Sequence, residues 1–195
     1  VLTLDNRAFR EIAQFAPYEF VEILFNNETY GGGGIFGQFS TAAAGSDWAE
    51  YLFIHEFGHH FAALADEYYT SPVAYQSGTE RPEPWEPNVT ALQDPATLKW
   101  KDKVKAGTPL PTPWPKDKFE AYQRDYQKRR GALRAANKPE SEMNALFREE
   151  LEFTKRLLNS SSTARDVGAF EGANYQASGY YRSEIECVMF SRIDH

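Results

Sequence analysis

The sequence predicts an α/β fold of the α+β kind, and three patterns support this prediction. Residues 19–25 are largely apolar and alternate in polarity, which is typical of a strand, and the glycine run 31–34 is a second extended segment. A strongly apolar helix is expected over residues 47–64. Two charged helical runs follow, over 119–136 and 140–158. We therefore expect a twisted mixed sheet beside one apolar helix, with a separate helical pair later in the chain.

Polar residues at the expected helix starts support these assignments. Asp5 begins a short helical segment that extends to about Phe15. Asp47 is expected to cap the apolar helix, and Glu50 three residues later would complete a capping box. Asp117 is expected to cap the first charged run. A short proline-containing break separates the two charged runs, so we expect them to form an antiparallel helical hairpin.

The apolar helix presents two stripes of residues at spacings of three and four. The first stripe predicts a core face, made of Ile54, Phe57, Phe61 and Leu64. The second stripe contains Leu52, His55, His59 and Ala62 or Ala63. Because the helix is apolar on most sides, we expect it to be buried.

Residues 55–59 read His-Glu-Phe-Gly-His, the pattern H-E-x-x-H, inside this helix. Histidines four residues apart lie on one helical face, so His55 and His59 can bind one Zn²⁺. Glu56, next to the first histidine, can then act as general base toward water on that metal. Random scattering would produce this pattern on the order of once in a hundred such chains, so an ordinary core helix with satisfied histidines is the alternative.

A catalytic zinc usually takes three protein ligands, so a third ligand is expected outside the histidine pair. Asp66 and Glu67 follow the helix and are the candidates, of which we favour Asp66. The acid lies one residue later than the third ligand of the metzincin pattern H-E-x-x-H-x-x-G-x-x-H. His60 points about 100° away from the histidine pair on an ideal helix, so it is not assigned to the metal. A solvated helix end is the alternative for the two acids.

The stretch from His55 to Tyr69 closely resembles the signature of the immunoglobulin A peptidase family of zinc metallopeptidases. Three further segments fit the same family: Tyr30 to Ile35, Phe170 to Tyr175, and Tyr181-Arg182 followed by Cys187-Val188-Met189. The resemblance implies a zincin-like, metzincin-like catalytic domain that binds zinc. It also implies a protein or peptide substrate, with immunoglobulin or another host glycoprotein as candidates, and a secreted or cell-surface location.

The chain departs from the family pattern at three positions. The family often has a small residue where His60 stands, a glycine near Ala63, and a proline where this chain has Ser183. The first two departures suggest that the exit of the helix packs differently here.

The flanking motifs have expected roles in such a site. By resemblance to zincins, Gly32, Gly33 and Gly34 would belong to an edge strand to which a peptide substrate adds by backbone pairing; a phosphate-binding loop or a plain turn are the alternatives. Met189 would form the apolar floor of a methionine turn, or else fill an ordinary core position. A donor to the oxyanion is expected among Tyr175, Tyr180, Tyr181 and Arg182, and we select Tyr181.

We expect one metallopeptidase catalytic domain over residues 1–195, with 72–165 as an insertion made of a loop rich in proline and tryptophan and the helical hairpin. The hairpin is expected to recognise substrate or another domain, or else to present a solvated face. The loop is expected to line the substrate cleft or to pack as a structural loop. The N-terminus opens inside the expected layout, and the family's cysteines continue beyond Cys187, so we expect truncation at both ends.

Composition limits the partners. With 21 basic and 28 acidic residues the formal net charge is −7, which argues against nucleic acid. No apolar run is long enough to span a membrane, so no transmembrane segment is expected. The single cysteine excludes an internal disulfide.

These observations together predict a zinc-dependent metalloendopeptidase that hydrolyses peptide bonds of protein substrates. His55, His59 and Asp66 would hold the metal, and Glu56 would activate its water. Two alternatives stay open: a non-catalytic surface module that binds glycan or protein, and a zinc hydrolase acting on a non-peptide bond.

Overall fold

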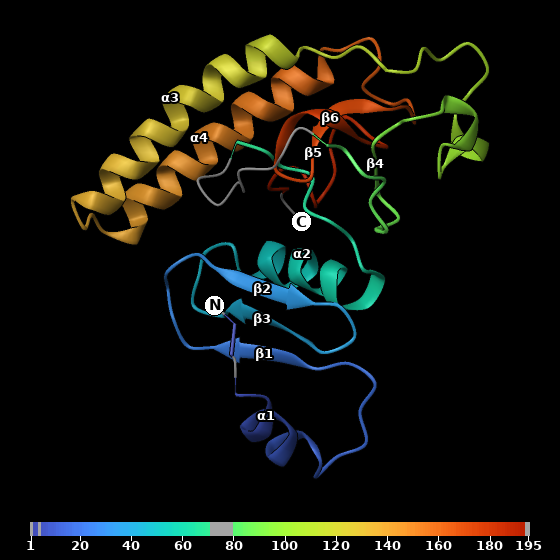
Figure 1. Cartoon of the computed structure of the whole chain (residues 1–195). Helices are drawn as coiled ribbons and strands as arrows, with labels where there is room; N and C mark the ends of the chain where they lie inside the picture. Colours follow the sequence, from blue (N-terminus) through green and yellow to red (C-terminus); the bar gives the residue numbers. More distant parts are fainter. Residues whose placement is uncertain (1, 4, 71–79, 194–195) are drawn as a thin grey trace. The chain divides into compact units, whose positions relative to one another are not determined.

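The computed structural model describes residues 2–3, 5–70 and 80–193, which form an α+β fold of helices and two small sheets (Figure 1). The chain divides into two compact units, the first over residues 1–64 and the second over residues 65–193. Among the described residues, no helix is both long enough and apolar enough to cross a membrane.

The first unit is a small mixed sheet with one long helix against it (Figure 1). Its elements in chain order are α1 (Asn6–Ala13), β1 (Glu22–Phe25), β2 (Gly32–Ile35), β3 (Phe39–Ala43) and α2 (Ala49–Ala62). The strand order is β1-β3-β2, with β1 parallel and β2 antiparallel to β3. The glycine strand therefore lies at an edge of this sheet, as expected by resemblance to zincins.

The central strand β3 is an element of the first unit that the sequence pattern did not reveal, and β4, β5 and β6 of the second unit were not predicted either. All five of its residues are buried, because it pairs on both sides and α2 packs on it. Its sequence, Phe-Ser-Thr-Ala-Ala, has neither the alternation nor the β-branched run by which a strand is usually recognised. The small side chains instead allow the close packing of the helix.

Two expectations about the start and the faces of α2 are wrong. The helix begins at Ala49 with Trp48 as its N-cap and no side-chain cap, so Asp47 is not the capping residue. A turn precedes the helix, in which Ala49 N–H donates to the carbonyl of Ser46 at 3.0 Å, and this turn delays the helix start.

The expected core stripe of α2 is also wrong. Ile54 and Phe61 are 42% and 54% exposed. The buried residues lie on the motif-bearing side instead: Tyr51, Leu52, His55, Glu56 and His60. The polar motif faces the protein because β2 and β3 pack against this side of the helix.

The second unit combines a helical hairpin with an antiparallel three-stranded sheet (Figure 1). Its elements are β4 (Val89–Thr90), two 3₁₀ turns (Pro95–Thr97 and Lys101–Lys103), α3 (Lys116–Ala135), α4 (Glu140–Asn159), β5 (Phe170–Ala173) and β6 (Gln176–Arg182). The strand order is β4-β6-β5. Packed around this sheet is an apolar core of Tyr69, Phe119, Leu158, Phe170, Ile185 and Phe190.

The predicted antiparallel hairpin of α3 and α4 is confirmed. Arg134 near the end of α3 pairs with Glu140 at the start of α4, and Arg129 pairs with Glu149 further along, at 2.6 Å. The predicted cap is wrong, because α3 begins at Lys116 after Pro115 and no side chain caps it, which places Asp117 in the first turn.

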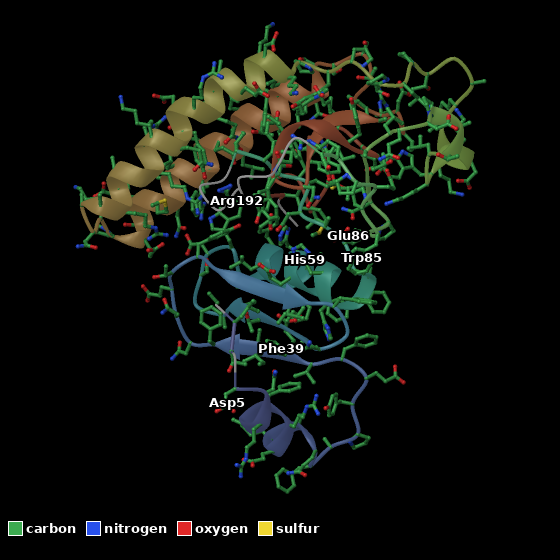
Figure 2. All side chains as sticks on the ribbon, viewed as in Figure 1. Asp5, Phe39, His59, Trp85, Glu86 and Arg192 are labelled. Atoms are coloured by element: carbon green, nitrogen blue, oxygen red, sulfur yellow. The ribbon has the colours of Figure 1, made fainter. Side chains whose placement is uncertain are left out.

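A cation links the hairpin to the C-terminal segment within the second unit (Figure 2). Arg192 donates to a carboxylate oxygen of Glu150 on α4 at 3.1 Å and lies 4.1 Å above the ring of Phe147. The hairpin therefore supports the segment that carries Met189. The prediction of a single domain with an insertion over 72–165 stays a prediction, and its first part, 72–79, lies outside the described residues.

Candidate active site and metal centre

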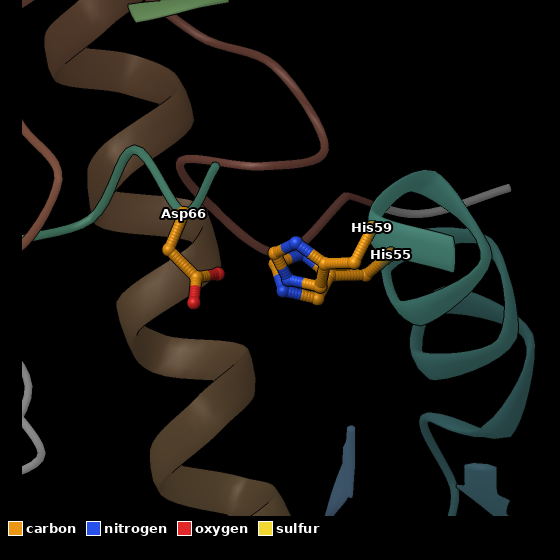
Figure 3. A group of neighbouring side chains, drawn as sticks. All are labelled: His55, His59 and Asp66. Atoms are coloured by element: carbon orange, nitrogen blue, oxygen red, sulfur yellow. The ribbon is translucent and has the colours of Figure 1, made fainter. Parts of the chain in front are cut away.

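The two histidines of the motif lie one helical turn apart on α2. Their ring centroids are 5.0 Å apart with an interplanar angle of 87°. Figure 3 shows both imidazoles leaving the helix on the same side. This is the arrangement that the spacing of four residues predicts, and it allows one nitrogen of each ring to reach a common ion.

Each histidine ring has a partner at Nδ1. The hydroxyl of Tyr51 lies 3.3 Å from Nδ1 of His55, and the carbonyl oxygen of Leu64 lies 2.5 Å from Nδ1 of His59. The carbonyl can only accept, so in the neutral imidazole of His59 the proton is assigned to Nδ1 and Nε2 keeps its lone pair. A partner of this kind is what fixes the tautomer and the ring orientation of a metal-binding histidine.

The end of α2 brings the Leu64 carbonyl to His59. Ala63 follows the helix in the left-handed conformation, with φ of 55°, and Leu64 N–H donates back to the carbonyl of Gly58 at 3.3 Å. This turn reverses the chain within two residues. The contact between the histidine and the carbonyl is therefore produced by the C-cap.

Glu56 lies beside the histidine pair on the same helix. It is buried, and its Oε2 is 4.0 Å from Nε2 of His59. The carboxylate is thus within reach of a small molecule, such as water, that also contacts Nε2. This placement agrees with the general-base role expected for the motif.

The glycine strand packs directly on these residues. A Cβ at Gly32 would lie 2.7 Å from Cγ of Glu56, and a Cβ at Gly34 would overlap the carbonyl oxygen of Glu56 and approach Cβ of His59 to 2.7 Å. Gly33 points to the opposite face, toward Leu2. Gly32 and Gly34 therefore permit β2 to lie against the motif at a distance that other residues prevent.

His60 does not share the environment of the pair. It is buried, its Nδ1 lies 3.2 Å from the carbonyl oxygen of Ile35, and its Nε2 accepts from Val21 N–H at 3.3 Å. These two bonds tie α2 to the ends of the strands. His60 is thus a structural residue, as its direction on the helix predicts.

Asp66 is the acidic residue that would join the histidines in a metal site. Together the three side chains offer two imidazole nitrogens and one carboxylate oxygen (Figure 3). Tyr175 donates its hydroxyl hydrogen bond to Oδ2 of Asp66. Burial, and then the negative charge of Asp66, raises the pKa of the neighbouring Tyr68 above its usual value. The set of two imidazoles and one carboxylate suits a divalent transition metal.

Glu67 has a different environment, inside the second unit. Its two carboxylate oxygens accept from Asn88 and from the thiol of Cys187, each at 2.9 Å. Burial raises its pKa, and the hydrogen bond from Cys187 and the charge of Arg182 oppose that rise. Because both oxygens are bound within the unit, Glu67 anchors the segment that carries Asp66.

Met189 lies in a turn, and its role as an apolar floor beneath the metal stays a prediction. Phe190 N–H donates to the carbonyl of Cys187 at 3.0 Å, and the side chain of Met189 is buried. Its carbonyl accepts from Glu67 N–H at 2.9 Å. The methionine turn is therefore joined to the residue that follows Asp66.

Tyr181 lies on β6 opposite Glu171 of β5, and burial, followed by the charge of Glu171, raises its pKa. The other oxyanion candidates have partners in the second unit: Tyr180 donates to the carbonyl of Pro82 at 3.1 Å, and Arg182 donates to main-chain carbonyls. The role of Tyr181 stays a prediction.

Two residues that hold the expected ligands or their neighbours were not predicted from the sequence. Tyr51 stands four residues before His55, a spacing that places it on the same face and would have revealed it. Asn88 bonds both Ala65 N–H and the Ala65 carbonyl, at 2.8 and 2.9 Å, and so holds the residue before Asp66. No local pattern connects Asn88 with Asp66, because the contact depends on the fold.

Comparison with known proteins identifies the family. The family model described as IgA Peptidase M64 matches residues 1–195. No curated protein matches the chain. The matched stretch includes the histidine pair, Glu56 and Asp66, and it extends through the methionine turn. Because the match covers the whole sequence, the chain belongs to the IgA peptidase M64 family of metallopeptidases.

Proposed function

We propose that this protein is a zinc-dependent metalloendopeptidase that hydrolyses peptide bonds of protein substrates. The observation that carries the proposal is the histidine pair, with Nδ1 of His59 held by a main-chain carbonyl and Glu56 beside Nε2. Packing of an ordinary core helix does not require two histidine rings on one face or a carboxylate beside them. The family supports the peptidase activity.

His55, His59 and Asp66 would hold the ion, and Zn²⁺ suits two imidazoles and one carboxylate. When bound there, zinc supplies a Lewis acid that polarises the scissile carbonyl and acidifies water. Glu56 accepts the proton of the attacking water and passes it to the leaving amine. Tyr181 would donate to the developing oxyanion, and Met189 would form the apolar floor beneath the site.

Chain geometry supports Asp66 as third ligand. Three residues carry the chain from Ala63 to Asp66, a reach of at most about 11 Å. The length of the connecting chain therefore keeps Asp66 close to the end of α2. Glu67 is next along the chain, but its carboxylate is engaged by Asn88 and Cys187. These contacts leave Asp66 as the better donor.

The edge position of β2 supports a peptide substrate. β2 pairs with β3 on one side, and its glycines lie against Glu56 and His59. A substrate strand that pairs with the other side would run along the motif. Gly32, Gly33 and Gly34 would bind substrate through their backbone, which agrees with endopeptidase action inside a chain. We further propose an extracytoplasmic location, with immunoglobulin or another host glycoprotein as candidate substrate.

The test begins with the metal content of the purified protein, measured by mass spectrometry. We expect about one zinc per chain, retained in Glu56→Gln and lost in Asp66→Ala. Glu67→Gln is the matched control, because it preserves the shape of the neighbouring acid, and it should keep the metal. Loss in Glu67→Gln beside retention in Asp66→Ala would move the ligand assignment by one residue.

Activity is then measured on a panel of unfolded and folded proteins, with a chelator control. Wild type should cleave and Glu56→Gln should lose at least about a thousandfold in rate, because general-base catalysis contributes on that order. A metal-loaded Glu56→Gln protein with wild-type cleavage would exclude the mechanism. Cleavage of esters or amides outside proteins, without protein cleavage, would indicate a non-peptide hydrolase.

A further inference from the structure

The segment around Asp66 is held by the turn between β5 and β6. Asn174 N–H donates to the main-chain carbonyl of Asp66 at 3.0 Å, and Tyr175 N–H donates to the carbonyl of Tyr68 at 3.2 Å. The same turn sends the hydroxyl of Tyr175 to Oδ2 of Asp66. Backbone and side chain of one turn thus fix both the position of Asp66 and the direction of its carboxylate.

This turn has an unusual backbone. Asn174 and Tyr175 both have positive φ, 51° and 61°. Asparagine adopts this left-handed conformation readily, whereas an aromatic residue does so at a cost. A glycine at position 175 would remove the strain but also the phenol. Backbone strain of this kind persists where the residue supplies something else, and here it supplies the hydroxyl that meets Asp66.

Neighbouring contacts hold the phenol in place. The rings of Tyr175 and Tyr68 pack edge to face, with centroids 5.4 Å apart and an interplanar angle of 80°. The residues before and after Asp66 are also held. The side chain of Asn88 bonds the N–H and the carbonyl of Ala65, and the carbonyl of Met189 accepts from the N–H of Glu67. The carboxylate is therefore presented by a segment that is tied on each side, and Tyr175 is a partner of its Oδ2, beside the hydrogen bond that Tyr68 makes with Asp66.

We propose that Tyr175 is a positioning residue for the metal ligand Asp66. Its hydroxyl holds Oδ2, which directs the other oxygen, Oδ1, to the ion. Hydrogen-bonded partners of ligating carboxylates typically contribute 10- to 100-fold to metal affinity. This inference rests on the proposed function, since it requires Asp66 to be a ligand, and it assigns Tyr175 to the ligand rather than to the oxyanion.

The experiment measures the affinity for Zn²⁺ by competition with a chromophoric chelator, and the ligand geometry by the visible absorption of the Co²⁺-loaded protein. Tyr175→Phe keeps the ring against Tyr68 and removes only the hydroxyl. We expect it to weaken zinc binding by about 10- to 100-fold and to alter the Co²⁺ spectrum. Tyr69→Phe is the matched control, because the Tyr69 hydroxyl donates to another carboxylate, Glu120, at 3.3 Å; it should bind zinc as wild type does.

A double variant tests whether Tyr175 acts through Asp66. In the Asp66→Ala background, Tyr175→Phe should cause no further loss of zinc affinity, because the two changes remove one interaction. A merely structural role would give an additional loss. Tyr175→Asn, which suits the left-handed backbone, serves as a second variant and should weaken zinc binding at least as much as Tyr175→Phe.

The outcomes separate this inference from the proposed function. Wild-type zinc affinity in Asp66→Ala would overturn the ligand set itself. Loss in Asp66→Ala, with wild-type affinity and spectrum in Tyr175→Phe, would overturn only the role of Tyr175. A lower catalytic rate in Tyr175→Phe at unchanged affinity would overturn positioning and indicate a direct role in catalysis.

Discussion

Nδ1 of His59 lies 2.5 Å from the carbonyl oxygen of Leu64, five residues later in the chain. The contact exists because α2 ends at Ala62 and the next residue turns the chain back. The orientation of one predicted metal ligand is therefore coupled to the C-cap of its own helix. A substitution that alters the conformation of the cap should therefore move the Leu64 carbonyl and change the orientation of the His59 ring.

Ala63 adopts φ of 55°, where glycine is favoured over alanine. Ala63→Gly should raise the free energy of unfolding by about 1 kcal/mol, because it removes the steric cost of Cβ in the left-handed conformation. Urea unfolding measures this change. Ala62→Gly, at the last residue of the helix, is the control and should destabilise by up to about 1 kcal/mol. Destabilisation by both variants would show that the cap conformation differs from the one described.

Gly34 allows β2 to lie against the motif. Gly34→Ala should lower the free energy of unfolding by about 1–3 kcal/mol and reduce activity, because its Cβ would overlap Glu56 and crowd His59. Gly31→Ala is the matched control, since a Cβ at Gly31 meets nothing within 4 Å. Denaturant unfolding and a cleavage assay check both variants. Equal behaviour of the two would contradict the close packing.

Glu22 on β1 provides a pH-dependent test. Burial raises its pKa above the ordinary glutamate value, and the hydrogen bond from the Ser40 hydroxyl opposes the rise. A raised carboxyl pKa means that folding favours the neutral form, so its stabilising contribution is present in acid and lost as pH rises through the folded pKa. Glu22→Gln should therefore gain stability relative to wild type as pH increases toward neutrality.

The measurement for Glu22 is the difference in unfolding free energy between the two proteins across that pH range. It should be smallest below the ordinary glutamate pKa, where the wild-type side chain is neutral in both states. A difference that stays constant, or that grows toward acid pH, would contradict the assigned direction of the shift.

Metal removal should destabilise the folded protein, because an ion that binds only the native state adds to its stability. At a free metal concentration a thousand times Kd the contribution is about 4 kcal/mol. Thermal unfolding with and without chelator measures it. The chelator should have little effect on Asp66→Ala and its full effect on Glu56→Gln. An equal chelator effect on Asp66→Ala and wild type would argue against Asp66 as ligand.

The local sequence pattern was sufficient to predict features that depend on a single helix, strand or hairpin. The spacing of His55 and His59 predicts their shared face, and the glycine run predicts a strand that proves to lie at a sheet edge. The helical hairpin was also predicted, because each of its helices is long and amphipathic and the break between them contains a proline. The family resemblance, which the full-length match confirms, rests on similar local motifs.

Features that depend on packing could not be predicted. The apolar spacing of Ile54 and Phe61 suggested a core face, yet the sheet packs on the motif side because Gly32 and Gly34 leave room there. The strand β3 was missed because its small residues suit a central, helix-covered position rather than an alternating pattern.

The sequence by itself determined the candidate catalytic motif of this protein, since the identities and spacing of His55, Glu56 and His59 on one helix follow from the covalent chain and helical geometry. The tertiary structure decided the environment of the two acids that follow. Adjacent carboxylates differ because Asn88 and Cys187 bind Glu67, whereas Tyr175 binds Asp66. Those partners are 21 to 120 residues away along the chain, so only folding brings them to the acids.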